Sequence, residues 1–89
     1  MPYHSEEYKE LFEAILKLET VEECEAFFDD LMTYKELASM NQRIHAARLL
    51  LEGKTYEQII SETEISSATL ARVSKCVQLG EGYKNILRK

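Results

Sequence analysis

Regularly placed helix-start signals constrain the fold of this chain more than any other feature of its sequence. A threonine followed three residues later by Glu or Gln predicts a capping box, in which the hydroxyl accepts a bond from an amide of the first turn and the Glu or Gln side chain accepts one in return. Three such pairs occur: Thr20 with Glu23, Thr33 with Glu36, and Thr55 with Gln58. Each pair therefore predicts the start of a helix.

The apolar residues between these signals recur with helical spacing. They form three predicted faces: Tyr8, Leu11, Phe12, Ile15 and Leu18; Val21, Cys24, Phe27, Phe28 and Leu31; and Leu37, Met40, Ile44, Ala47 and Leu51. No alternating run of β-branched residues competes with them. Gly53 and Gly80 follow apolar runs, at the positions where a left-handed residue commonly ends a helix. The sequence thus predicts an all-α chain of about six helices, over 5–18, 20–31, 34–51, 56–62, 67–79 and 82–88.

The length of 89 residues is that of one small domain, predicted here as 1–89. A chain of this size buries only about 60–65% of the surface of its unfolded form, and oligomerisation is a common way to bury more. The aromatic faces of the front half are explained either by ordinary core packing or by a core that continues across a dimer interface. We divide the domain into core and dimerisation helices (5–51), a helical pair (55–79) and a C-terminal helix (80–89).

Several classes of protein are disfavoured by the composition. Cys24 and Cys76 are too few and too far apart for a disulfide framework, and they form no metal-ligand pattern with His4 and His45, so neither a metal nor another cofactor is expected. The N-terminal residues do not resemble a signal peptide, and no run approaches the ~20 apolar residues of a membrane span. We expect a cytoplasmic protein that does not bind membranes.

Charge is divided unevenly along the chain, whose formal net charge is −5. Residues 1–52 have a net charge of −7, whereas residues 53–89 have a net charge of +2. An acidic body with a basic end is typical of proteins that turn one face toward nucleic acid.

The segment 55–73, TYEQIISETEISSATLARV, has the spacing of a helix-turn-helix. A short helix begins at the Thr55 cap and turns Ile59 and Ile60 inward, and 63–66 forms the turn around an apolar residue, Ile65. Ser66 or Ser67 then caps a second helix, whose buried side is predicted to contain Leu70, Val73 and Val77. In such a unit the second helix lies in the major groove of DNA, with its N-terminal residues at the base edges.

The predicted DNA contacts follow from residue chemistry. Small side chains allow close approach to the groove, hydroxyls bond bases or phosphates, alanine methyls contact thymine methyls, and cations contact phosphates. No acid lies between Glu64 and Glu81 to cancel these cations. The predicted contacts are Lys54, Thr55, Ser66, Ser67, Ala68, Thr69, Ala71, Arg72 and Lys75.

Two residues depart from the usual helix-turn-helix pattern. Ile60 stands near the helix crossing, where a small residue is usual, and Glu64 replaces the common glycine of the turn. These departures predict a variant turn. The alternative, in which the two helices only pack in a bundle, gives no reason for the small, acid-free start of the second helix.

On these residues the chain resembles the Trp repressor family, and in particular its YerC/YecD-type branch of small bacterial regulators. The resemblance covers about 30–86, through LMTYKELASMNQRIHAARLLLEG, TYEQII and ISSATLARVS. It implies an intertwined homodimer on a palindromic operator, with the two recognition helices ~34 Å apart. It also implies that the apolar N-terminal helices form the dimer interface, for which we predict Leu11, Phe12, Ile15, Phe27, Phe28 and Leu31.

In the Trp repressor, two arginines flank the bound tryptophan, and the resemblance places Arg43 and Arg72 at their positions and Thr33 at a matching threonine. The residue after the second arginine is glycine in the repressor but Val73 here. Overpacking of this kind costs ~1–3 kcal/mol, so we expect Val73 to fill the pocket and tryptophan not to be the corepressor. Another small-molecule corepressor stays possible.

The two arginines then need another explanation. Arg72 is predicted to contact a phosphate, and pairing with Glu36 or Glu57 at the surface is the alternative that we favour for Arg43.

The predicted function is a homodimeric, sequence-specific DNA-binding transcription regulator, with repression favoured and without a response to tryptophan. The alternative is a helix-turn-helix-shaped protein-interaction module that does not read DNA. An enzyme is not expected, because the sequence contains no glycine-rich phosphate loop, no HExxH and no supported nucleophile and base.

Overall fold

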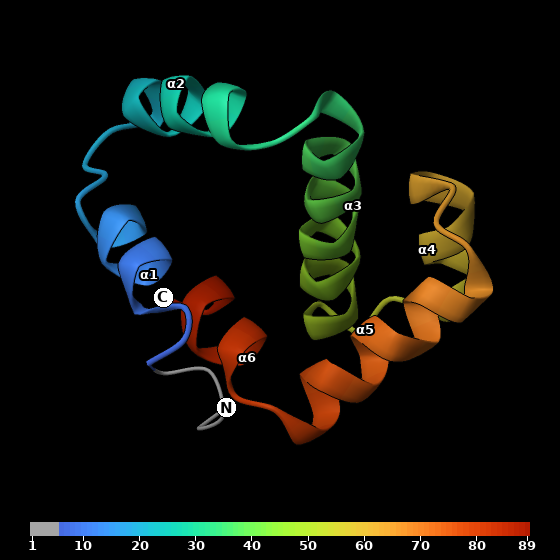
Figure 1. Cartoon of the computed structure of the whole chain (residues 1–89). Helices are drawn as coiled ribbons and strands as arrows, with labels where there is room; N and C mark the ends of the chain where they lie inside the picture. The colour runs from blue at the N-terminus through green and yellow to red at the C-terminus, as the bar shows by residue number, and fades with distance from the viewer. Residues whose placement is uncertain (1–5) are drawn as a thin grey trace. The chain divides into compact units, whose positions relative to one another are not determined.

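The computed structural model describes residues 6–89, and this part of the chain is helical throughout, with short connections (Figure 1). The helices are α1 (Lys9–Leu16), α2 (Val21–Leu31), α3 (Tyr34–Leu51), α4 (Tyr56–Thr63), α5 (Ser67–Leu79) and α6 (Gly82–Leu87). The predicted all-α class and the predicted order of six helices are confirmed for these residues. The predicted bounds agree with the observed ones to within a residue for α2 to α6.

The first helix is shorter than the predicted range 5–18, whose first residue lies outside the described part. Tyr8 precedes α1 without a side-chain cap, and residues 6–8 form a turn. At the other end, the amides of Lys17 and Leu18 donate to the carbonyls of Ala14 and Ile15, both at 3.1 Å. These tight final bonds span three residues instead of four and end the helix. Apolar spacing alone did not reveal these ends, because it continues beyond the hydrogen-bonded turns.

The capping predictions have three different outcomes. Thr55 and Gln58 form the complete capping box, with the Thr55 amide 2.9 Å from Gln58 Oε1 and the Gln58 amide 3.2 Å from Thr55 Oγ1. The Thr20 hydroxyl caps α2, but the Glu23 carboxylate accepts from the Glu19 amide at 2.8 Å, so the predicted return bond to Thr20 is wrong. The capping box of Thr33 with Glu36 stays a prediction.

The two glycines also differ. Gly53 has φ +90, as predicted for a left-handed helix end, and the next amide, of Lys54, donates to the Leu49 carbonyl at 3.0 Å. The prediction for Gly80 is wrong, because its backbone is extended. A Cβ at Gly80 would lie 2.8 Å from the Cys76 carbonyl oxygen. Glycine is therefore required there by the close approach of the backbone and not by a left-handed conformation.

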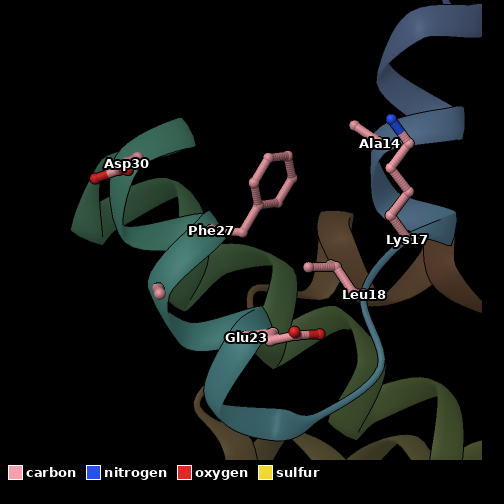
Figure 2. Close-up of a pocket in the computed structure, with 7 residues that line it drawn as sticks. Ala14, Lys17, Leu18, Glu23, Phe27 and Asp30 are labelled. Atoms are coloured by element: carbon pink, nitrogen blue, oxygen red, sulfur yellow. The ribbon is translucent and has the colours of Figure 1, made fainter.

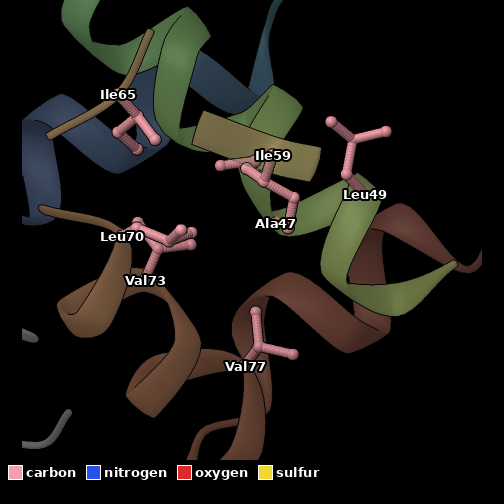
Figure 3. Close-up of a cluster of buried hydrophobic side chains, with 8 residues drawn as sticks. Ala47, Leu49, Ile59, Ile65, Leu70, Val73 and Val77 are labelled. Atoms are coloured by element: carbon pink, nitrogen blue, oxygen red, sulfur yellow. The ribbon is translucent and has the colours of Figure 1, made fainter. Parts of the chain in front are cut away.

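The chain consists of two compact units, unit 1 (Met1–Tyr34) and unit 2 (Lys35–Lys89). Unit 2 has a hydrophobic core between α3, α4 and α5 (Figure 3). Leu50, Leu51, Tyr83 and Leu87 are partly buried and pack against it. The core corrects two predictions. Ile60 is 36% exposed and does not turn inward, and Ile44, on the predicted α3 face, is exposed as well. The buried apolar residues are Ala46, Ala47, Leu49, Ile59, Ile65, Leu70, Val73 and Val77.

Unit 1 has no buried residue in either of its helices. Its apolar side chains instead border an open groove of about 480 Å³ between α1 and α2 (Figure 2). The groove is lined by Ala14, Lys17, Leu18, Glu23, Ala26, Phe27 and Asp30.

Within residues 6–89, no helix has the length and hydrophobicity that crossing a membrane requires. The same residues contain no group of three or more His, Cys, Asp or Glu side chains placed to hold a metal ion.

Candidate nucleic-acid interface

The helix pair α4 and α5 is joined by a three-residue turn whose backbone is set residue by residue. Glu64 adopts the left-handed conformation, with φ 60, at the end of α4. Ile65 is only 2% exposed and packs into the core, and Ser66 has the extended backbone of a helix N-cap. Of the two serines proposed as the cap, Ser66 fills that role. The usual glycine of this turn is thus replaced by a glutamate that takes the same left-handed backbone.

The two sides of α5 are chemically opposite. Leu70, Val73, Ser74 and Val77 are buried. Figure 3 shows Leu70, Val73 and Val77 among the core side chains that also come from α3 and α4. The other side of the helix is exposed and presents Ser67, Ala68, Ala71, Arg72 and Lys75. The core therefore holds α5 by one side and leaves free the side predicted to contact DNA.

The hydroxyls at the start of α5 have different tasks. Ser66 Oγ accepts from the Thr69 amide at 3.1 Å, and the Ser66 hydroxyl donates to Thr69 Oγ1 at 2.9 Å. Ser66 is thus occupied in shaping the first turn, and Thr69 is partly buried. Ser67, which is exposed, is the hydroxyl best placed for an outside partner.

The two predicted contacts before α4 are both exposed. Lys54 follows the left-handed Gly53. The Thr55 side chain is held by Gln58, since its hydroxyl both accepts from the Gln58 amide and lies 3.2 Å from Gln58 Oε1. Lys54 therefore offers a charge at the start of α4, whereas Thr55 mainly caps that helix.

The cations of α5 are not neutralised by neighbouring acids. Salt bridges of unit 2 join Arg48 to Glu52 at 3.1 Å and His45 to Glu62 at 3.9 Å. Neither involves Arg43 or Arg72, so the predicted alternative of pairing with Glu36 or Glu57 does not hold for either arginine. An exposed guanidinium without a carboxylate partner is suited to bind phosphate.

The residues of the predicted ligand pocket fall in both units. Thr33 belongs to unit 1, and the other three belong to unit 2. Arg43 on α3 and Arg72 on α5 are exposed, whereas Val73 is only 2% exposed and forms part of the core. The prediction that Val73 is a core residue is confirmed.

The predicted dimer-interface residues lie on α1 and α2 of unit 1. Leu11, Phe12 and Leu31 are 38–47% exposed, and Ile15, Phe27 and Phe28 are partly exposed. The rings of Phe27 and Phe28 make an edge-to-face contact, with centroids 5.5 Å apart and planes at 73°. Unit 1 on its own covers none of these six side chains completely.

One polar contact next to the turn was not predicted. Gln42 Nε2 on α3 donates to the carbonyl of Thr63, the last residue of α4, at 3.0 Å, and the bond is partly buried. The two residues are 21 positions apart. Local spacing carries no signal for such a pair, so only the fold reveals it.

The geometry of α4, the turn and α5 defines a helix-turn-helix protein with an exposed basic second helix. Comparison with known proteins agrees with this class. The model of the family described as Trp repressor protein matches residues 6–89. YerC of Bacillus subtilis (strain 168), an uncharacterised protein, is 49% identical over 74 residues, which are 83% of this chain and 71% of YerC.

Two solved structures are similar to the chain as well. A candidate Trp repressor from Staphylococcus aureus has 46% identity and a TM-score of 0.86, covering 90% of this chain and 81% of its own. A TrpR-like protein from Eubacterium eligens ATCC 27750 has 37% identity and a TM-score of 0.86, covering 90% and 84%. The chain belongs to the Trp repressor family. Membership implies a helix-turn-helix DNA-binding regulator, from a family without enzymatic activity.

Proposed function

We propose that this protein is a sequence-specific transcription regulator that binds a palindromic operator as a homodimer, represses by occupying it, and does not use tryptophan as corepressor. The observation that carries the proposal is the two-sided α5. Its buried side is fixed in the core, and its exposed side presents small residues, one free hydroxyl and two cations without an acid among them. Such a surface allows close approach to the major groove, where base edges are read.

The parts of this surface have separate roles. Ser67, Ala68 and Ala71 are exposed near the start of α5 and are proposed to face the base edges. Arg72 and Lys75 follow on the same helix, and with Lys54 they are proposed to contact phosphates, which position the protein without reading sequence. Ser66, Thr55 and Thr69 support this surface mainly by holding the first turns of α4 and α5.

The proposed dimer rests on unit 1. Its two helices bury none of their apolar side chains, and Phe27 lines the open groove between them. Large apolar side chains left exposed on two successive helices are suited to a protein–protein contact. We propose that a second copy covers Leu11, Phe12, Ile15, Phe27, Phe28 and Leu31.

Insensitivity to tryptophan rests on Val73. Its side chain is part of the packed core, where the resemblance places a glycine that leaves room for an indole. An indole could occupy the space of the Val73 side chain only if the core of unit 2 opened. Titration calorimetry should therefore show no micromolar binding of tryptophan, and heat of binding in that range would refute this part of the proposal.

The phosphate contact is tested by comparing two exposed arginines. Arg72→Ala should reduce the slope of log affinity against log salt by about 0.9, the value for one phosphate contact on duplex DNA. Arg43→Ala removes the same charge from α3 and is the matched control, with little expected change. Fluorescence anisotropy on duplex DNA at several salt concentrations measures both variants. Equal slopes for wild type and Arg72→Ala would contradict the proposed docking.

The same titration separates DNA binding from the alternative function, a protein-interaction module. Binding through several phosphates weakens steeply as salt rises. A protein that binds no duplex even at low salt, while forming a salt-insensitive complex with another protein, would support the alternative instead.

A further inference from the structure

Three hydrogen bonds meet at Thr63, the residue that ends α4. Gln42 Nε2 donates to its carbonyl at 3.0 Å, its hydroxyl donates to the Ile59 carbonyl at 2.7 Å, and the Ile65 amide donates to Thr63 Oγ1 at 3.2 Å. The last two are local to α4 and the turn. The bond from Gln42 alone ties this point to a different helix, α3.

The bond from Gln42 is important because Thr63 lies directly before the turn. The next residue, Glu64, is left-handed, and Ser66, two residues further on, caps α5. A non-glycine residue keeps such a backbone only where its surroundings hold it in place. A small change in the torsions at this point would redirect the whole of α5.

The core around the turn does not provide the same control. Ile59 and Ile65 are buried beside Thr63, but hydrophobic burial is non-directional and fixes proximity more than angle. A hydrogen bond weakens steeply when it is bent, so it constrains orientation. A second polar contact between α3 and α4, from His45 to Glu62, is 3.9 Å long and lies near the surface, which makes it a weak restraint.

We propose that Gln42 is a positioning residue that sets the direction of α5 and thereby the sequence specificity of the protein, without touching DNA itself. The proposal rests on the function proposed above. It predicts that the specific complex, which needs base edges aligned with α5, depends on Gln42. Nonspecific binding, which needs only phosphates near cations, does not depend on it.

The variant that tests this is Gln42→Met, which keeps an unbranched side chain of similar length but removes the donor. A bond can bias the turn by no more than its own net contribution, so affinity for the specific duplex should fall about threefold to tenfold. Affinity for a scrambled duplex at the same salt should stay within about twofold. Asn41→Ala, an exposed change at the neighbouring position of α3, is the matched control.

A second measurement, on the protein without DNA, tests whether the bond from Gln42 to Thr63 holds the turn in place. Hydrogen exchange at the Ile65 amide should speed up in Gln42→Met relative to wild type, since that amide bonds to Thr63. Amides in the middle of α3 should exchange at unchanged rates. This arm needs no DNA and also shows whether the variant is folded.

The outcomes separate the two proposals. The inference is supported if the wild-type protein prefers the specific duplex and the Gln42→Met variant loses affinity for that duplex but not for the scrambled one. Equal losses on both duplexes, or no loss on either, overturn the inference and leave the proposed function intact. A wild-type protein that prefers no sequence overturns the proposed function and this inference with it, whereas the exchange data still decide whether Gln42 holds the turn.

Discussion

The two units of this chain use apolar residues in opposite ways. Unit 2 buries eight apolar side chains, seven from three helices and Ile65 from the turn, in a core of its own, and α5 is held by that core. Unit 1 has helices with equally clear apolar faces, and neither helix contains a buried residue. Unit 2 thus has an internal source of stability, whereas the faces of unit 1 are left for a partner. We attribute the difference to function, since α5 needs a rigid support and unit 1 is proposed to join two copies.

The largest expected effect is on stability and comes from a substitution in the core of unit 2. Leu70 is fully buried, so Leu70→Ala should reduce the free energy of unfolding by about 2–5 kcal/mol. Leu79→Ala on the same helix is the matched control, because Leu79 is 75% exposed and should cost under about 0.5 kcal/mol. Urea unfolding followed by circular dichroism measures both. A small loss at Leu70 would contradict the core, and a large loss at Leu79 would mean that another surface covers that residue.

The next effect concerns unit 1. Leu31 is 47% exposed on α2, and Leu31→Glu would place a charge in the proposed dimer contact. The dissociation constant of the dimer should rise at least about 30-fold, the effect of losing a central interface residue. Sedimentation equilibrium measures this constant, and Glu25→Gln, an exposed change on the same helix, is the control. If the variant sediments as wild type does, Leu31 lies outside any dimer interface.

A smaller effect is expected where α5 leads into α6. In Gly80→Ala the new methyl would meet the Cys76 carbonyl oxygen at 2.8 Å, so the backbone must shift. We expect a loss of about 1–2 kcal/mol in the free energy of unfolding, within the range for overpacked sites. Gly82→Ala is the control, since a Cβ there meets nothing within 4 Å. Thermal unfolding of both variants would show equal stabilities if the close approach were not a constraint.

The smallest effect has the opposite sign. Glu64 holds a left-handed backbone that costs a residue with a Cβ about 1–2 kcal/mol and glycine little. After allowance for the greater freedom of glycine in the unfolded chain, Glu64→Gly should stabilise unit 2 by about 0.5–1 kcal/mol. Chemical denaturation measures the gain. Destabilisation would show that the Glu64 side chain makes a contribution larger than the strain of its backbone.

Local chemistry made most of the fold predictable. The complete capping box of Thr55 and Gln58, the left-handed Gly53 and the buried Ile65 each follow from a residue and its near neighbours. The errors arose where a local rule had more than one outcome. Glu23 could return its bond to Thr20 or reach Glu19, and Gly80 could serve a left-handed turn or a close approach.

The candidate site was predictable to the same extent. The exposed side of α5 could be assigned because its residues share a helix whose buried side is marked by Leu70, Val73 and Val77. The inward position expected for Ile60 was wrong because α4 turns Ile59 into the core and leaves the side chain of Ile60, about 100° further round the helix, at the surface. The bond between Gln42 and Thr63 depends on how α3 and α4 cross, which a pattern along the chain does not encode.

The most direct test is a selection of duplexes from a randomised pool by the purified wild-type protein, with and without tryptophan, followed by sequencing. The proposed regulator should enrich a palindrome whose half-sites are about one helical turn apart, equally in both conditions. Failure to enrich any sequence in either condition would contradict sequence-specific binding through α5, and enrichment only with tryptophan would contradict the role given to Val73.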